Sequence, residues 1–301
     1  MDRRRFLATG ALAAATFSNA TALAKDAPLM RTIASSGEAV PAIGMGSWLT
    51  FDVGADSIAR AQRRDVLRAF FDAGGRLIDS SPMYGSSQEV IGWCLNALGG
   101  PEQLIAADKV WTPQGENGPT QIERSRARWG VARFDLLQVH NLVNWREHLA
   151  GLFQMKADGR LHYVGVTTYA GLRHDEVERI MKSEKIDFVQ LTYNIADREA
   201  ETRLLPLAMD RGIAVIANRP FREGQLFART PRAPLPDFAA ETGATSWAQF
   251  MLQFIISHPA ITCAIPATRR VDHMNENMAV LRGPLPDAAL RRRMAEAFAG
   301  L

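Results

Sequence analysis

The sequence of 301 residues has little cysteine, little net charge and no long apolar run. Its two cysteines, Cys94 and Cys263, are too few for a disulfide framework, and free cysteines are usually buried. The formal net charge of +3 is too small to indicate binding to nucleic acid. With 47% hydrophobic and 22% charged residues, the composition is that of an ordinary globular protein. The length allows one large α/β domain or two smaller ones.

The first 24 residues form a separate segment, which we interpret as a secretory signal. Three basic residues, Arg3-Arg4-Arg5, precede an apolar run, 8–15, that is shorter than the ~20 residues of a membrane-spanning helix. Residues 21–24, Thr-Ala-Leu-Ala, end the segment with the small residues that a signal peptidase reads. Twin arginines followed by Phe-Leu resemble a twin-arginine export signal, and a disordered basic leader is the alternative.

We therefore predict a signal peptide at residues 1–24 and a single domain at residues 25–301. The protein is expected in the periplasm, with the export machinery as a partner and without stable insertion into a membrane. Removing residues 1–24 takes away three arginines and one aspartate, which lowers the formal net charge from +3 to +1. The basic balance thus belongs largely to the leader.

Apolar, β-prone runs of about six residues alternate with amphipathic helical stretches over most of the remaining chain. The predicted strands are 42–47, 76–81, 104–110, 135–140, 163–168, 188–193, 213–218 and 262–268. The predicted helices are 57–73, 87–98, 120–129, 147–156, 174–182, 199–210, 246–256 and 273–280. Eight strands, each followed by a helix, predict a (β/α)8 TIM barrel. A doubly wound open sheet is the competing fold, but the first strand–helix turn has no Gly-x-Gly-x-x-Gly.

Three segments lie outside this repeat. Residues 31–40 alternate around Ser-Ser-Gly as a short hairpin would, and we expect this hairpin to cover the bottom of the barrel. Residues 285–299 form a predicted terminal helix with Pro286 near its start. Residues 221–237 are rich in proline, glycine and basic side chains, and we interpret them as a loop above the barrel mouth.

Four polar residues follow or end predicted strands: Asp79, Tyr84, Lys109 and His140. The carboxyl ends of the strands of a parallel barrel meet at one face, so these side chains are expected to form one site. An ammonium at Lys109 would favour the phenolate of Tyr84 and lower its pKa, while an ion pair with Asp79 would keep Lys109 charged. Tyr84 would then be a general acid, and His140 would donate a hydrogen bond to a carbonyl oxygen.

These residues stand in motifs that resemble those of the aldo/keto reductases. The resemblance covers Gly44-Met45-Gly46-Ser47-Trp48, the Asp79…Tyr84-Gly85 spacing and Lys109-Val110-Trp111. It continues through residues 136–141, Val164-Gly165-Val166-Thr167-Thr168, Val189-Gln190, Ile265-Pro266 and Asn275-Glu276-Asn277. It implies a (β/α)8 barrel that uses a nicotinamide dinucleotide to reduce an aldehyde or ketone to an alcohol, with Asp79, Tyr84, Lys109 and His140 as the catalytic residues.

The resemblance also implies the binding residues. Those for the cofactor are Gly46, Ser47, Thr167, Thr168, Gln190, Asn218, Arg219, Phe221, Thr268, Arg269, Arg270, Glu276 and Asn277. Those for the substrate pocket are Trp48, Trp111 and Trp145. Because arginine matches phosphate geometry, Thr268, Arg269 and Arg270 favour NADP(H) over NAD(H).

The sequence departs from the family pattern at several of these positions. Thr167-Thr168 replaces Ser-Asn, and Asn218 replaces a tyrosine that stacks on the nicotinamide. Ala267 and His273 stand where a lysine and an arginine usually contact the 2′-phosphate. A ligand-binding or regulatory barrel with little turnover therefore stays open as an alternative. A metal-dependent TIM-barrel hydrolase is disfavoured, because no histidines and carboxylates have ligand spacing at the strand ends.

Overall fold

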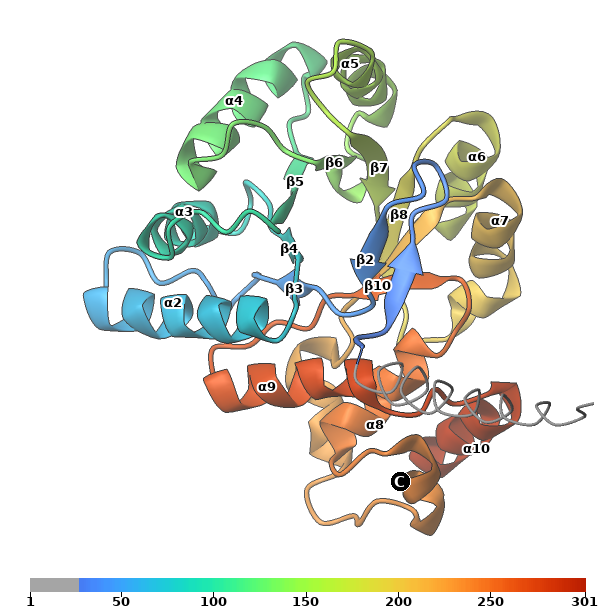
Figure 1. Cartoon of the computed structure of the whole chain (residues 1–301). Helices are drawn as coiled ribbons and strands as arrows, with labels where there is room; N and C mark the ends of the chain where they lie inside the picture. Colours follow the sequence, from blue (N-terminus) through green and yellow to red (C-terminus); the bar gives the residue numbers. More distant parts are fainter. Residues whose placement is uncertain (1–26) are drawn as a thin grey trace, which may run out of the picture.

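The computed structural model describes residues 27–301, so the predicted signal peptide lies outside the described residues. Eight parallel strands form one sheet in the order β10-β9-β8-β7-β6-β5-β4-β3, and helices surround it (Figure 1). A parallel bridge between Ile43 and Ala264 joins the two ends of this order. The sheet is therefore closed, which confirms the predicted barrel and excludes the open doubly wound sheet.

Each barrel strand is followed by a helix, as predicted. The strands are β3 (Met45–Gly46), β4 (Leu77–Asp79), β5 (Ile105–Val110), β6 (Leu136–Val139), β7 (Tyr163–Thr167), β8 (Phe188–Thr192), β9 (Ala214–Asn218) and β10 (Ile261–Ala264). The helices are α2 (Ser57–Asp72), α3 (Ser87–Ala97), α4 (Gly118–Trp129), α5 (Trp145–Ala157), α6 (His174–Ser183), α7 (Leu204–Arg211), α8 (Trp247–Ile256) and α9 (Val271–Ala279).

Two separate apolar clusters fill the fold, one on each side of the sheet. On β5, Ala106 and Val110 pack in the cluster beneath the helices, whereas Ile105 and Ala107 belong to the cluster inside the barrel. Successive strand residues point to opposite faces, so every buried strand needs apolar side chains on both. This requirement explains the continuous apolar runs in the sequence.

The predicted hairpin is confirmed and closes the bottom of the barrel. Strands β1 (Met30–Thr32) and β2 (Ala39–Pro41) pair antiparallel, and Figure 1 shows them lying across the barrel. Ile33 and Val40 of this hairpin pack on the interior cluster near the start of the strands. The terminal helix, α10 (Ala288–Ala299), is also confirmed and follows the last barrel helix.

Local predictions failed where proline interrupts an element. The predicted helix 199–210 is a 3-10 turn, η3 (Glu199–Thr202), followed by α7, because Pro206 is tolerated only in the first turn of a helix. Strand β10 ends at Ala264, ahead of Pro266, which cannot donate a ladder hydrogen bond. The predicted loop 221–237 contains a kinked 3-10 segment, η4 (Arg222–Arg229).

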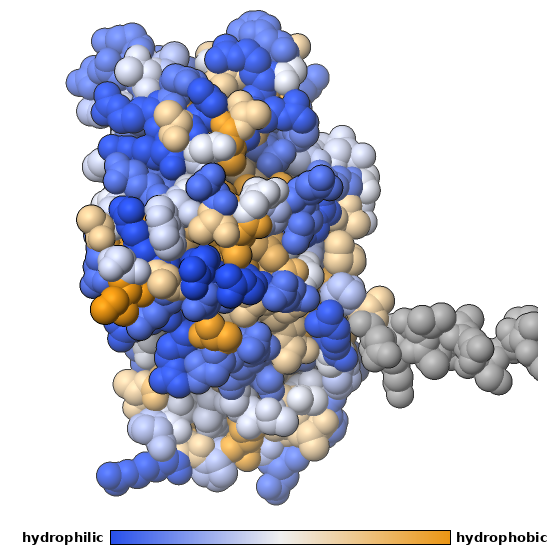
Figure 2. Space-filling model, turned by 60° about the vertical axis from the view of Figure 1, so that its left-hand side comes forward, coloured by the Kyte–Doolittle hydropathy of each residue, from blue (hydrophilic) through white to orange (hydrophobic). Residues whose placement is uncertain are grey.

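The face of the molecule that Figure 2 shows is mostly polar. In Figure 2 the hydrophilic residues dominate the visible face and the apolar ones lie in small separate groups. Both cysteines are buried and free, as expected. Among residues 27–301, no helix is long and apolar enough to cross a membrane.

Candidate active site

The four predicted catalytic residues lie together at the carboxyl end of the barrel strands. Asp79 is the last residue of β4, Lys109 lies near the end of β5 and His140 directly follows β6. Tyr84 is in the loop between β4 and α3, and its ring centre is 5.2 Å from Lys109 Nζ. The rings of Tyr84 and His140 are 5.7 Å apart and nearly perpendicular. The parallel barrel thus brings together side chains that are up to 61 positions apart in the sequence.

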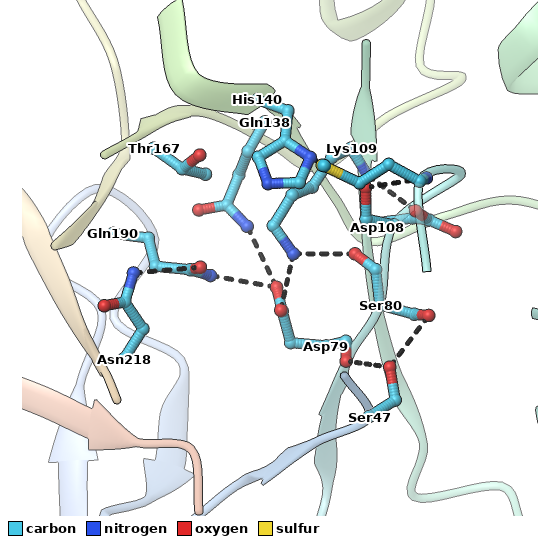
Figure 3. Close-up of polar contacts among 12 residues, drawn as sticks. Ser47, Asp79, Ser80, Asp108, Lys109, Gln138, His140, Thr167, Gln190 and Asn218 are labelled. Carbon is cyan, nitrogen blue, oxygen red and sulfur yellow. Dashed lines mark hydrogen bonds and ion pairs between the residues drawn. The ribbon is translucent and has the colours of Figure 1, made fainter. Parts of the chain in front are cut away.

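The Asp79–Lys109 ion pair is buried and fully partnered. Lys109 Nζ is 2.5 Å from Asp79 Oδ2 and donates to the Ser80 carbonyl at 2.7 Å. The other carboxylate oxygen, Asp79 Oδ1, accepts hydrogen bonds from Gln190 at 2.9 Å and Gln138 at 3.3 Å (Figure 3). Burial alone would lower the pKa of Lys109, but attraction to Asp79 raises that pKa above its ordinary value. The ammonium therefore stays charged inside the protein.

The position of Tyr84 depends on a short loop that is fixed at its far end. Asp52, from the loop after β3, accepts hydrogen bonds from the backbone N–H and the hydroxyl of Ser86, both at 2.8 Å. Between them, Gly85 adopts a left-handed backbone with φ +56°, and a Cβ at Gly85 would collide with the Asp52 carboxylate. The Tyr-Gly pair of the sequence motif therefore has a steric reason in this chain.

The pKa of Tyr84 differs from the sequence prediction. Burial raises this pKa above its ordinary value and outweighs the lowering effect of Lys109. The prediction of a lowered pKa was wrong because the tyrosine lies among protein atoms, where the charged phenolate loses hydration. At neutral pH Tyr84 therefore carries its proton, which is the form that a proton donor needs.

His140 is neutral and held at one ring nitrogen. Its Nδ1 atom is 2.7 Å from the hydroxyl of Ser81. Burial, followed by the positive charge of Lys109, lowers the pKa of His140 well below its ordinary value. The ring can therefore donate one hydrogen bond without carrying a charge.

A cavity of about 710 Å³ opens above these residues, a volume in the range of small-molecule and cofactor sites. Tyr84, His140 and Asp79 lie on its wall, as does Trp48, whose ring is 6.2 Å from that of Tyr84. The cavity wall also includes Gly46, Ser47, Thr167, Thr168, Gln190, Asn218, Arg219, Phe221, Thr268, Glu276 and Asn277. Most of the sequence-predicted cofactor residues thus border one space.

Asn218 belongs to a hydrogen-bond network that leads back to Asp79. Its amide donates to the Thr168 carbonyl at 2.9 Å and to Gln190 Oε1 at 3.4 Å, and its oxygen accepts from Thr192 at 2.6 Å. Gln190 in turn donates to Asp79. The position of the expected stacking tyrosine is therefore occupied by Asn218, whose amide forms hydrogen bonds at the ends of β7 and β8 and has no aromatic ring to stack on a cofactor.

Four predicted binding residues do not border the cavity. Arg269 and Arg270 lie outside its wall, and Arg270 forms a surface ion pair with Asp272. Trp111 and Trp145 are also outside, and the Trp145 indole donates to Glu176 at 2.8 Å. The sequence motifs predicted these residues at the binding site, but the cavity wall does not include them.

The residues that border the cavity fit a dinucleotide. Asn277 is buried and borders the cavity, and its side-chain amide has no hydrogen-bond partner within residues 27–301. Such an amide is suited to bind a nucleobase. Thr168, Gln190 and Asn218 are polar residues that border the same cavity as Tyr84 and His140. Asn277 and these three side chains would hold the two halves of the nucleotide.

Sequence reasoning missed several residues of this site. Gln138 precedes His140 by two positions, and the strand period of two places both on the same side of β6. Ser81 follows Asp79 by two positions and contacts His140. Period-two spacing was the available signal for both. Trp247 and Phe227 also border the cavity, but they come from α8 and η4, and no motif near them indicated a site.

Comparison with known proteins agrees with this arrangement. A model of the aldo/keto reductase family matches residues 42–293. Methylglyoxal reductase YeaE from Escherichia coli strain K12 is 27% identical over 256 residues, covering 83% of this chain and 89% of that protein. NADH-specific methylglyoxal reductase from the same strain is 25% identical and covers 85% of this chain and 95% of its own length.

A solved structure supports the same fold. An aldo-keto reductase from Klebsiella pneumoniae in complex with NADPH superimposes with a TM-score of 0.73 at 23% identity, covering 90% of this chain and 95% of that one. The family match spans nearly the whole barrel, from the residues before β3 to within α10. This chain belongs to the aldo/keto reductase family.

Proposed function

We propose that this protein reduces an aldehyde or ketone to an alcohol with a nicotinamide dinucleotide, and that Tyr84 donates the proton. The observation that carries the proposal is that Tyr84 and His140 border one cavity, while Lys109, paired with Asp79, lies 5.2 Å from the centre of the Tyr84 ring. The cofactor supplies hydride to the carbonyl carbon when bound. The alternative, a binding barrel without turnover, has no need for a buried ammonium beside a phenol.

The roles of the side chains follow from their charges. His140 binds the carbonyl oxygen and orients it, because a neutral imidazole can donate a hydrogen bond without competing for a proton. As negative charge develops on that oxygen, Tyr84 transfers its phenolic proton to it and completes the alcohol. Lys109 stabilises the phenolate that remains, and Asp79 keeps Lys109 charged and in place. Solvent then returns a proton to Tyr84.

The test is the substitution Tyr84→Phe in the protein comprising residues 25–301. We expect kcat for carbonyl reduction to fall by about 10²–10⁴-fold, the usual contribution of a general acid, while nucleotide binding is retained. Tyr163→Phe is the control, because it removes a phenol at the opposite end of the barrel. Retained reduction in Tyr84→Phe would refute the assignment, and nucleotide binding without any reduction by the wild type would favour the binding barrel.

The nucleotide and the first substrate are chosen from the relatives. One relative is described in complex with NADPH and another is named NADH-specific, so both nucleotides are titrated by tryptophan fluorescence. NADP(H) remains our expectation. Of the three residues that suggested it, only Thr268 borders the cavity, so Arg269 and Arg270 would have to turn inward to reach a phosphate. Methylglyoxal is the first carbonyl to assay, since two relatives are named after its reduction.

We further propose that the leader directs export to the periplasm, on the pattern of residues 1–24. Mass spectrometry of the periplasmic fraction checks this: a chain beginning near residue 25 is expected, and a full-length chain found only in the cytoplasm would contradict it.

A further inference from the structure

The side chain of Ser81 lies behind the histidine of the active site. Ser81 is fully buried in the loop after β4, and its hydroxyl oxygen is 2.7 Å from His140 Nδ1. The same oxygen accepts a hydrogen bond from the backbone N–H of Met83 at 3.3 Å. Ser81 does not border the cavity, so it can act on a ligand only through His140.

The direction of the Ser81–His140 hydrogen bond follows from the surrounding partners. If Nδ1 carried the proton and donated it, the Ser81 hydroxyl hydrogen would have no acceptor within the described part of the chain. An unsatisfied donor in a fully buried site is costly. If Ser81 donates to Nδ1, the hydroxyl hydrogen is satisfied and the Met83 N–H still has its acceptor. The second arrangement satisfies every group.

The other ring nitrogen of His140 is open to a ligand. Nε2 has no hydrogen-bond partner within residues 27–301, and His140 borders the cavity together with Tyr84. A neutral imidazole carries one proton, so a proton excluded from Nδ1 must be on Nε2. The Ser81 hydroxyl therefore selects the form of His140 that presents a donor to the cavity.

We propose that Ser81 is a positioning residue that donates a hydrogen bond to His140 Nδ1 and so keeps the imidazole proton on Nε2, facing the substrate oxygen. Donors aimed at an oxygen that gains negative charge stabilise the transition state, and a donor fixed in advance needs no reorganisation. The inference rests on the proposed function for the identity of that oxygen. The tautomer itself is a property of the folded protein and can be measured without substrate.

The first experiment measures the tautomer directly. Two-bond ¹H–¹⁵N correlation spectra of the histidine-labelled protein, residues 25–301, show which ring nitrogen of each histidine carries the proton. The spectrum of His140→Gln assigns the His140 signals among the six histidines. We expect the proton on Nε2 in the wild type at neutral pH. A proton on Nδ1 would overturn the proposal, whatever the enzyme activity.

The second experiment is Ser81→Ala, with Ser125→Ala as a matched control. Ser125 is an equally buried hydroxyl on α4 that accepts from Gln88 and contacts neither His140 nor the cavity. In Ser81→Ala we expect kcat to fall about tenfold, as for the loss of one hydrogen bond, with unchanged nucleotide affinity and the His140 proton shared between both nitrogens. Ser125→Ala should retain kcat.

The outcomes separate this inference from the proposed function. An unchanged kcat together with an unchanged Nε2 proton in Ser81→Ala would show that Ser81 has no positioning role. If Ser81→Ala does not fold, the wild-type spectrum still decides the direction of the hydrogen bond. Failure of the proposed function appears instead as retained reduction in Tyr84→Phe, which does not alter the result of the tautomer measurement.

Discussion

At the scale of single residues, two buried carboxyl groups lie next to Lys109, one on each face of the sheet. Lys109 points into the barrel and pairs with Asp79, whereas its neighbour Asp108 points outward beneath α3 and α4. Asp108 is fully buried, and within residues 27–301 its oxygens accept only from the Lys109 backbone N–H at 2.7 Å and from Gln88 at 2.8 Å. Two neutral donors compensate a buried charge poorly, so burial raises the pKa of Asp108 to about 7.

Because the pKa of Asp108 is raised in the folded protein, the free energy of unfolding depends on pH. Between its ordinary pKa of 3.8 and about 7, the folded protein binds this proton more tightly than the unfolded chain does. The contribution of Asp108 to stability is therefore complete below pH ~4 and is lost as pH rises through about 7. At about 1.4 kcal/mol for each pKa unit, the loss amounts to a few kcal/mol.

Asp108→Asn tests this dependence by urea unfolding between pH 4 and pH 8. Asparagine cannot ionise, so the free energy of unfolding of the variant relative to wild type should improve by a few kcal/mol from the lower to the higher pH. Asp72→Asn, at the exposed end of α2, controls for the loss of one negative charge. A difference between Asp108→Asn and wild type that does not change with pH would contradict the prediction.

At the scale of elements, the loop between β4 and α3 decides where the proton donor lies. Gly85→Ala places a Cβ at a left-handed position and against the Asp52 carboxylate, which is held by Ser86. We expect a loss of about 1–3 kcal/mol in the free energy of unfolding, the range for such backbone strain. We also expect a lower kcat, because relief of the collision displaces either the Asp52 carboxylate that holds Ser86 or the loop that carries Tyr84.

The matched control for this loop is Gly130→Ala at the end of α4. Gly130 has nearly the same φ, +66°, but no atom lies within 4 Å of a Cβ built there. Gly130→Ala should lose about 1 kcal/mol in the free energy of unfolding, through the left-handed backbone alone, and should keep its kcat. The two variants are compared by thermal unfolding and by steady-state reduction. Equal effects on kcat would show that the Asp52 contact does not position Tyr84.

Elements were predictable where a local rule decides them and not where distant segments meet. The run from Arg76 to Ser81 and the helix that ends before Gly74-Gly75 carry period and stop signals within a few residues. Pro206 carried a stop signal too, and the single helix predicted over 199–210 ignored it. The 3-10 segment η4 gave no such signal. Its kinked residues, Glu223 and Gly224, border the cavity.

At the scale of the molecule, eight strand–helix repeats predict the barrel because each unit buries one strand and one helix face. The Asp79–Lys109 pair could be predicted for the same reason, since both residues lie at or near the carboxyl ends of neighbouring strands. The orientations of Arg270 and Trp145 could not, because an ion pair with Asp272 holds the first and a hydrogen bond to Glu176 holds the second. The space around Asn218 likewise depends on three strands that the sequence separates.

Closure of the barrel depends on the seam between its first and last strands, where Gly44 permits close contact. The Gly44 N–H donates to the Ala264 carbonyl at 2.8 Å, and a Cβ at Gly44 would lie 2.8 Å from the Leu77 carbonyl and 2.9 Å from Cys263 Sγ. Gly44→Ala should therefore destabilise the whole fold by about 1–3 kcal/mol, as overpacking does, in one cooperative urea transition. Gly151→Ala, in α5 with open space around it, should instead be neutral or stabilising by up to about 1 kcal/mol. Because the seam lies beside β4, whose last residue, Asp79, pairs with Lys109, Gly44→Ala should also reduce kcat. An unchanged free energy of unfolding would contradict the prediction, because it would mean that the strands can move apart at Gly44 without cost.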